Sequence, residues 1–270
     1  MARVCSGLGI SAVGVVVMVG CGGSTIGSEA GSGSPKEALL LGDELNTTTG
    51  TTRSALGYGE VVLLEPDDAF TEACTGVLVA PRVVLTAAHC VAFVTRKTWK
   101  VTAPFTPSGA RSVTARDGEP MDAAFKNATR DTYADKELRD VGVVYLDSPF
   151  EDASLAVVGA TGFPTDAASP PTFVATVGRT TDGSSPLALS APGTLVTGTG
   201  TRAVLEYGTT RLASTGQSGG PLFVEGTHKL VAVHAGTDST GKDRWARLDG
   251  DVYTWMTQKV SSHGGWFVRD

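Results

Sequence analysis

From Gly57 onward the chain is a succession of short runs rich in Val, Leu and Ala, each bounded by Gly, Pro, Asp or Ser. Runs with the length and composition of strands lie at residues 60–64, 76–79, 83–86, 141–146, 173–177 and 229–233. The 270 residues include 34 Gly and only 19% charged side chains, which favours strands and turns over long exposed helices. The sequence therefore predicts an all-β fold.

A helix is expected near the end of the chain. Asp249 can cap its first turn, and Val252, Trp255 and Met256 fall on one face at helical spacing. We expect this helix to pack against the strands by that face.

The first twenty residues predict export. Arg3 gives a short positive start, and residues 8–20 form an apolar stretch too short to span a bilayer as a helix. This is the pattern of a signal peptide over residues 1–20. The stretch ends in M-V-G followed by Cys21, which resembles the cleavage box of a bacterial lipoprotein and implies a lipid on the Cys21 thiol. An ordinary signal peptide cut near residues 20–23 is the alternative.

The composition changes after the apolar stretch. Between residues 22 and 56, 18 of 35 residues are Gly, Ser or Thr. Such a segment buries too little apolar surface to offset its chain entropy. We therefore expect residues 21–56 to carry the lipid anchor and form a flexible tether, and the folded domain to occupy residues 57–270.

The cysteines support an exported domain. Cys5 lies in the signal peptide and Cys21 is the lipidation candidate, so Cys74 and Cys90 remain as an even pair that is expected to form a disulfide. The histidines have no HExxH or CxxC companion, so neither a metal site nor a cofactor is expected. A net charge of -6 without a Lys/Arg run argues against nucleic acid as a partner.

Three segments carry candidate catalytic side chains. His89 follows a strand run and precedes a cysteine, so a disulfide would restrain an imidazole at the end of a strand. Asp140 directly precedes an apolar run, where a carboxylate needs a hydrogen-bond donor such as an imidazole N–H. Ser218 lies in the run G-Q-S-G-G at residues 216–220, whose glycines allow a sharp turn with outward-facing N–H groups. These residue types suit a serine nucleophile served by a general base.

With the motifs T-A-A-H-C, D-V-G-V-V-Y-L and G-Q-S-G-G-P in this order, the chain resembles the chymotrypsin/trypsin-like serine proteases over residues 57–260. The resemblance implies two packed antiparallel β-barrels of six strands each and a C-terminal helix, with the active site between the barrels. The N-barrel would span about residues 57–157, and the C-barrel with the helix about residues 158–260.

The resemblance also implies roles for individual residues. Ser218 would be the nucleophile, His89 the general base and acid, and Asp140 the group that orients His89 and stabilises its charged form. The backbone N–H groups of Gly216 and Ser218 would hold the oxyanion. The pair Cys74 and Cys90 matches the family's disulfide beside the catalytic histidine.

Two other carboxylates are rival partners for His89. Asp147 follows the apolar run and Asp135 lies in a polar segment, so neither has the placement directly before a buried strand. Asp140 is therefore the prediction.

The residue before the serine departs from the family pattern. Many members become active when a newly cut N-terminus, usually I-V-G-G, inserts its ammonium beside an Asp that precedes the nucleophile. Here that position is Gln217, and the nearest match to I-V-G-G is L-L-G-D at residues 40–43. An ammonium buried beside an amide would lose most of the attraction that offsets its desolvation. We expect the loop to be set without that ion pair.

The substrate pocket is the second departure. The resemblance places its base at Leu212, flanked by Ala213, with no carboxylate at that position of the sequence to meet Lys or Arg. Its wall would contain His234, Ala235 and Gly236. His234 resembles a histidine with which glutamyl endopeptidases bind an acidic side chain. The preference stays open between small or apolar and acidic side chains, and a basic preference is disfavoured.

The sequence thus predicts a monomeric serine endopeptidase that acts on a protein or peptide. It would be exported and held at the bacterial cell envelope by a lipid on Cys21, or secreted. A catalytically silent protease-like domain that binds peptides or an envelope partner is the alternative, which Gln217 keeps open. An esterase is a second rival, because G-x-S-x-G is formally present at 216–220. Esterases with that motif order their triad Ser, Asp, His and need alternating strands and helices.

Overall fold

The computed structural model describes residues 44–47, 50–68, 72–127, 138–159, 172–180, 185–197, 206–214 and 216–269. All of them belong to one unit, Ser34–Asp270. The predictions for the signal peptide, for Cys21 and for the first half of the tether lie outside the described residues. No helix in the described part of the chain is long and apolar enough to cross a membrane.

Strands account for most of the regular secondary structure in the described chain. They are β1 (Glu44–Thr47), β2 (Gly50–Ser54), β3 (Val61–Pro66), β4 (Cys74–Ala80), β5 (Val83–Thr86), β6 (Trp99–Ala103), β7 (Arg111–Pro120), β8 (Gly142–Leu146), β9 (Val157–Val158), β10 (Phe173–Arg179), β11 (Leu187–Leu189), β12 (Gly193–Thr194), β13 (Val196–Thr197), β14 (Glu206–Thr209), β15 (Pro221–Val224), β16 (Lys229–Thr237), β17 (Asp243–Arg247) and β18 (Val268–Arg269). The helices are α2 (His89–Ala92), the 3-10 helix η1 (Ala123–Asn127) and α3 (Gly250–Ser262). The all-β prediction is confirmed, and each predicted run coincides with a strand to within two residues at its start.

Strands β3, β4, β5, β8, β7 and β6 pair in that order and close into a barrel, called the N-barrel below. Its central strands are apolar on both faces. Val62 and Leu64 of β3 point into the barrel core, whereas Val61 and Leu63 join a second apolar cluster outside it. Side chains alternate between the two faces of each strand, and both faces are buried in an apolar cluster. The strands therefore appear in the sequence as continuous apolar runs.

The second half of the domain, for which the resemblance predicts another six-stranded barrel, forms one sheet of twelve strands. Antiparallel pairs lead from β10 through β15, β16 and β17 to β14. Residues 193–197 bring this path back to β10, because β12 pairs with β10 and β13 pairs with β14. The sheet has more strands than a six-stranded barrel because β1, β2, β9, β11 and β18 add to this path. We call it the C-terminal sheet.

The hairpin β1–β2 falls in the segment for which composition predicts a flexible tether. Strand β2 pairs with β11, and the guanidinium of Arg53 binds the carboxylate of Glu225 at 2.5 and 3.0 Å and the carbonyl of Ser190 at 2.8 and 3.0 Å. Backbone pairing and this ion pair supply the contacts that the Gly, Ser and Thr side chains cannot. The ordered domain therefore begins before residue 57.

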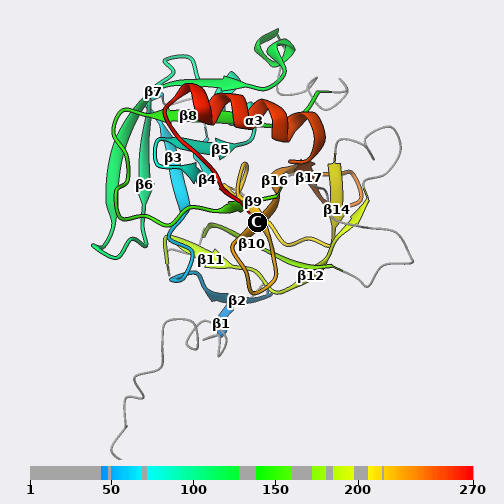
Figure 1. The fold of residues 1–270 in the computed structure, drawn as a ribbon. Coiled ribbons are helices and arrows are strands. Elements are labelled where there is room, and N and C mark those ends of the chain that lie inside the picture. The colour runs from blue at the N-terminus through cyan, green and yellow to red at the C-terminus, as the bar shows by residue number, and fades with distance from the viewer. Residues whose placement is uncertain are drawn as a thin grey trace, which may run out of the picture. The chain divides into compact units, whose positions relative to one another are not determined.

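The two halves share the second apolar cluster. It combines N-barrel residues such as Val83 and Leu85 with Val177 and Phe223 of the C-terminal sheet and with Met256 of α3. Figure 1 shows the N-barrel strands in cyan and green, strands β10 to β17 of the C-terminal sheet in yellow-green to orange, the added hairpin β1–β2 in blue, and the red helix α3 close to the strands of both halves. Because apolar side chains from both halves fill one cluster, the loops at the junction are held in fixed positions.

Helix α3 agrees with its prediction in position and in its apolar face, since Val252 and Met256 are buried and Trp255 packs against the shared cluster. The expected cap is wrong in one respect. Asp249 occupies the N-cap position, but its side chain makes no capping bond because the guanidinium of Arg247 binds its carboxylate at 2.6 and 3.1 Å.

The disulfide between Cys74 and Cys90 is present and joins the start of β4 to α2 across 16 residues. Replacing both cysteines by Ala should lower the free energy of unfolding by about 3 kcal/mol, because the unfolded chain regains the entropy of the open loop. Chemical denaturation of both proteins measures the difference. Wild type in reductant should match the variant, and equal midpoints for oxidised wild type and variant would contradict the prediction.

Candidate active site

Pairing between β5 and β8 brings His89 and Asp140 together. In this antiparallel pair Thr86 lies opposite Gly142, so the residues that follow β5 and precede β8 share one rim of the N-barrel. The carboxylate of Asp140 accepts Nδ1–H of His89 at 2.7 Å and the backbone N–H of His89 at 3.0 Å. Gly142 permits this approach, because a Cβ there would lie 3.1 Å from a methyl carbon of Val91.

Burial makes this hydrogen bond selective for one imidazole orientation. Asp140 is 1% exposed, so its charge depends on the two donors from His89 for stabilisation. This contact turns Nε2, the other ring nitrogen of His89, away from Asp140. Of the rivals, Asp147 follows the far end of β8 and pairs with Arg116 at 2.5 Å, and Asp135 lies outside the described residues.

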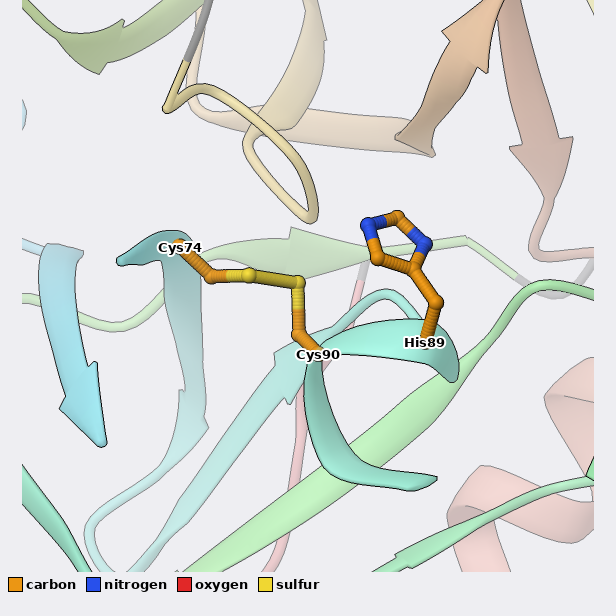
Figure 2. A group of neighbouring side chains, drawn as sticks. All are labelled: Cys74, His89 and Cys90. Carbon is orange, nitrogen blue, oxygen red and sulfur yellow. A yellow bond between two sulfur atoms is a disulfide. The ribbon is translucent and has the colours of Figure 1, made fainter. Parts of the chain in front are cut away.

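The disulfide lies next to this pair. Figure 2 shows the imidazole of His89 beside the Cys74–Cys90 bond. A ligand atom of each of these three residues lies within 4.8 Å of the others, a grouping that could hold a metal ion if both thiols were free. The disulfide consumes both thiols, and Nδ1 of His89 is bound to Asp140. The group therefore restrains the histidine in the oxidised protein.

Ser218 approaches the same disulfide from the C-terminal sheet. Residues 216–220, which we call the serine loop, come directly before β15. The carbonyl of Ser218 accepts the N–H of Thr75 at 2.9 Å and lies 3.7 Å from Sγ of Cys90. The carbonyl of Gly216 accepts the hydroxyl of Thr75 at 3.0 Å. The structure thus brings the main chain of Ser218 to the disulfide that borders His89.

Glycines are needed in this loop for two reasons. Gly216 and Gly219 have φ angles of 84° and 76°, in the left-handed region that side chains disfavour. A Cβ on Gly219 would also lie 2.0 Å from the hydroxyl of Thr86 and 2.6 Å from the backbone of Ala87. The loop therefore fits against the N-barrel only without a side chain at this position.

The backbone donors of the serine loop are unevenly used. The N–H groups of Gln217, Gly219 and Gly220 bind the carbonyls of Ser214, His234 and Gln217. Those of Gly216 and Ser218 make no hydrogen bond to any described residue. These are the two donors predicted to hold an oxyanion, and a negatively charged oxygen would satisfy both.

Gln217 is held entirely by neutral partners. It is 7% exposed; its side-chain oxygen accepts the N–H of Ser214 at 3.0 Å, and its amide donates to the carbonyl of Arg179 at 3.2 Å. Gly178 packs closely on it, since a Cβ there would lie 2.6 Å from the Gln217 side chain. No ammonium is needed to balance this amide.

Among the predicted pocket residues, His234 contacts the serine loop from strand β16. His234 is 5% exposed, and its backbone binds the loop in both directions, through its carbonyl to Gly219 and through its N–H to Gly220, each at 2.9 Å. Its ring lies 4.9 Å from that of Trp245, and neither ring nitrogen has a hydrogen-bond partner in the described part of the chain. Ala213 and Ala235 are buried, and Leu212 and Gly236 are partly exposed.

Sequence reasoning missed Asp243 in this pocket. One oxygen of its fully buried carboxylate accepts the N–H groups of Leu212 and Ala213 at 2.6 and 2.7 Å. The other accepts the hydroxyl of Thr237 at 3.2 Å and lies 3.6 Å from Nε2 of His234. Neither Leu212 nor Ala213 is a carboxylate, as the sequence analysis states, but strand β17 brings one against their backbone from 31 residues beyond Leu212 in the chain.

Burial by itself would raise the pKa of Asp243, but the imidazole of His234 and the N–H groups of Ala213 and Leu212 outweigh it and hold the pKa below its ordinary value. The carboxylate is therefore ionised at neutral pH. The N–H groups of Leu212 and Ala213 and the hydroxyl of Thr237 already bind the oxygens of Asp243, so this carboxylate is poorly placed to bind a substrate cation directly. Its direct effect is to fix the backbone of Leu212 and Ala213.

The closed barrel, the C-terminal sheet and the loops at their junction define a chymotrypsin-like fold. The family model for trypsin matches residues 61–257, more than half of the chain, and the protein belongs to the trypsin family. No curated protein matches the chain.

Solved structures agree on the fold. The VesB protease of Vibrio cholerae has a TM-score of 0.58 at 18% identity over 81% of this chain and 66% of that one, just under two thirds of its length. HL collagenase has a TM-score of 0.61 at 16% identity, covering 79% of this chain and 98% of that one. A Glu endopeptidase has a TM-score of 0.56 at 15% identity, covering 81% and 95%.

Two glycines with similar backbone angles separate strain from steric exclusion. Gly219→Ala should lower the free energy of unfolding by more than about 2 kcal/mol, because its Cβ would collide with the N-barrel. Gly226→Ala, with a φ of 71° and no atom within 4 Å of its Cβ, should cost about 1 kcal/mol. Chemical denaturation measures both. Equal losses would show that the serine loop can move away from the barrel.

Asp243→Asn should lower the free energy of unfolding by about 1–3 kcal/mol at pH 7, since an amide cannot accept all the donors around it. Because folding lowers the pKa of Asp243, its stabilising contribution is full above the unfolded value near ~4 and is lost as pH falls below it. The difference between wild type and variant should therefore shrink below about pH 4. Denaturation across pH measures it, with Asp147→Asn at the surface as control. A difference independent of pH would contradict the prediction.

Proposed function

We propose that the protein is a serine endopeptidase that works through Ser218, His89 and Asp140. The observation that carries the proposal is the buried hydrogen bond from His89 to Asp140 beside a serine loop with two unused backbone donors. Family membership supports a serine protease-type hydrolase that acts on proteins or peptides. The roles of the individual residues are our proposal.

In this mechanism Ser218 attacks the carbonyl carbon of the scissile bond while Nε2 of His89 takes the proton from its hydroxyl. Asp140 holds the ring by Nδ1 and stabilises the imidazolium that forms. The N–H groups of Gly216 and Ser218 bind the negatively charged oxygen of the tetrahedral intermediate. His89 then gives its proton to the leaving amine, and water hydrolyses the acyl-enzyme by the same steps.

Activation is proposed to need no new N-terminus. In the expected family scheme an ammonium balances a carboxylate beside the nucleophile, whereas here the amide of Gln217 is already satisfied by two backbone groups. A buried ammonium would have no charge to meet there. The loop that carries Ser218 is set by neutral contacts.

The pocket for the residue before the scissile bond is proposed to be formed by Leu212, Ala213, His234, Ala235 and Gly236. We expect small or acidic side chains to be preferred over Lys and Arg, because the carboxylate of Asp243 is saturated by internal donors. A solved Glu endopeptidase among the structural neighbours is compatible with an acidic preference, which the imidazole of His234 could serve, since it lies 3.6 Å from Asp243 but makes no hydrogen bond through its ring nitrogens.

The site of action is proposed to be the bacterial cell envelope. The apolar stretch at residues 8–20 and the sequence M-V-G before Cys21 support export and lipidation of Cys21. The protein would then act as a monomer on a lipid anchor.

A fluorophosphonate probe tests the catalytic proposal. The intact chain should be labelled, and Ser218→Ala and His89→Ala should each abolish labelling, because the probe reacts only with an activated serine. Thr254→Ala, exposed on α3, serves as a control for handling of the protein and should be labelled like wild type.

An unlabelled but folded wild type would contradict the proposal as stated. Labelling recovered after limited proteolysis near residue 41 would identify a latent zymogen and disprove activation without cleavage. Continued silence would favour the catalytically silent binding domain.

A further inference from the structure

Arg179 lies beside the serine loop on the side opposite His234. Strand β15, which follows Ser218, is paired with β10 on one side and with β16 on the other. Arg179 ends β10, and His234 belongs to β16. A Cβ on Gly216 would lie 3.1 Å from Cδ of Arg179, so this side chain packs directly over the loop.

The guanidinium of Arg179 is incompletely paired. Its Nε and Nη2 are shielded from solvent and have no hydrogen-bond partner in the described residues, and a carboxylate oxygen of Glu65 lies 3.6 Å from Nη2. Nε and Nη2 form one edge of the guanidinium, the edge that grips a carboxylate through two parallel hydrogen bonds. At 3.6 Å, Glu65 makes an ion pair but no such bond.

Glu65 also forms an ion pair with a second cation. Its other carboxylate oxygen lies 3.4 Å from Nζ of Lys100. The group Arg179, Glu65 and Lys100 therefore carries one net positive charge. Nε and Nη2 themselves are shielded, so an incoming carboxylate can approach only the solvent-facing part of Arg179, whose side chain is 24% exposed, while Glu65 remains with Lys100.

A peptide cleaved at Ser218 must extend to both sides of β15. If the residue before the scissile bond occupies the pocket beside His234, the residues after it pass on the Arg179 side. We infer that Arg179 is a specificity-determining residue that binds a carboxylate of the substrate on the leaving-group side, within two residues of the scissile bond. The inference rests on the proposed peptidase activity and on the proposed pocket.

The test uses the intact protein and a degenerate pool of peptides with amidated C-termini, whose products are sequenced by mass spectrometry. Cleavage sites should be enriched in Asp and Glu at the first or second position after the cut. Matched pairs of cleaved peptides that differ only by Glu or Gln there then give a ratio of kcat/KM. For wild type we expect a ratio of about three to ten, falling as salt is added.

Variants separate Arg179 from general charge effects. Arg179→Gln should bring the Glu/Gln ratio close to one, and Arg179→Lys should leave it between the two values. Glu65→Gln should raise the ratio, because it removes the internal competitor for Arg179. Arg111→Gln removes the same charge from strand β7 of the N-barrel, and this control variant should have the wild-type Glu/Gln ratio. Fluorophosphonate labelling of each variant shows that it is folded and has an activated serine.

A second arm distinguishes the source of the carboxylate. Peptides with Gln at both positions are compared as free acids and as amides, with the C-terminus two residues after the cut. A gain for the free acid that Arg179→Gln removes would extend the same site to a terminal carboxylate, and no gain would limit it to side chains.

A Glu/Gln ratio near one in labelled wild type, or one that Arg179→Gln leaves unchanged, would overturn the inference and leave the peptidase activity standing. Absence of both labelling and cleavage would overturn the peptidase activity and the inference together.

Discussion

The buried carboxylate of Asp140 is the constraint from which the geometry of the candidate active site follows. A charge that is 1% exposed is tolerated only with donors in place, and both of the donors described come from His89. The barrel supplies this arrangement through backbone pairing, since β5 and β8 carry the two residues at the same rim. A functional contact is thus fixed by a structural requirement. The histidine cannot turn away without leaving a buried charge unpaired.

The serine loop is fixed by a different principle, because neutral backbone groups hold it. Thr75 of the N-barrel binds the carbonyls of Gly216 and Ser218, and His234 binds the loop from the C-terminal sheet. The side chain of Gln217 adds two hydrogen bonds to neutral backbone groups. Since both halves of the domain contribute, the loop geometry depends on the apolar cluster that joins them. Neither half could by itself hold the main chain of Ser218 at the disulfide that borders His89.

Periodicity predicted the strands, and the count of cysteines left in the exported domain predicted the disulfide. The pairing of His89 with Asp140, which lie 51 residues apart, was predicted through the resemblance to the serine proteases and not from spacing alone. Asp243 was missed because its contacts with Leu212 and Ala213 depend on how β17 pairs with its neighbours, which spacing does not reveal. The hairpin β1–β2 was missed for a related reason. Its sequence is polar, and its order comes from pairing with β11 and from the contact of Arg53 with Glu225.

The charged groups on the two sides of β15 differ in how completely the protein satisfies them. Both oxygens of Asp243 accept hydrogen bonds from the protein, so its negative charge stabilises the backbone of Leu212 and Ala213. One edge of the Arg179 guanidinium has no hydrogen bond, so its positive charge is only partly compensated by the protein. A substrate carboxylate gains most beside a charge that the protein has not fully compensated. We therefore expect the preference for the residues after the cut to depend more on Arg179 than on the buried carboxylate of Asp243.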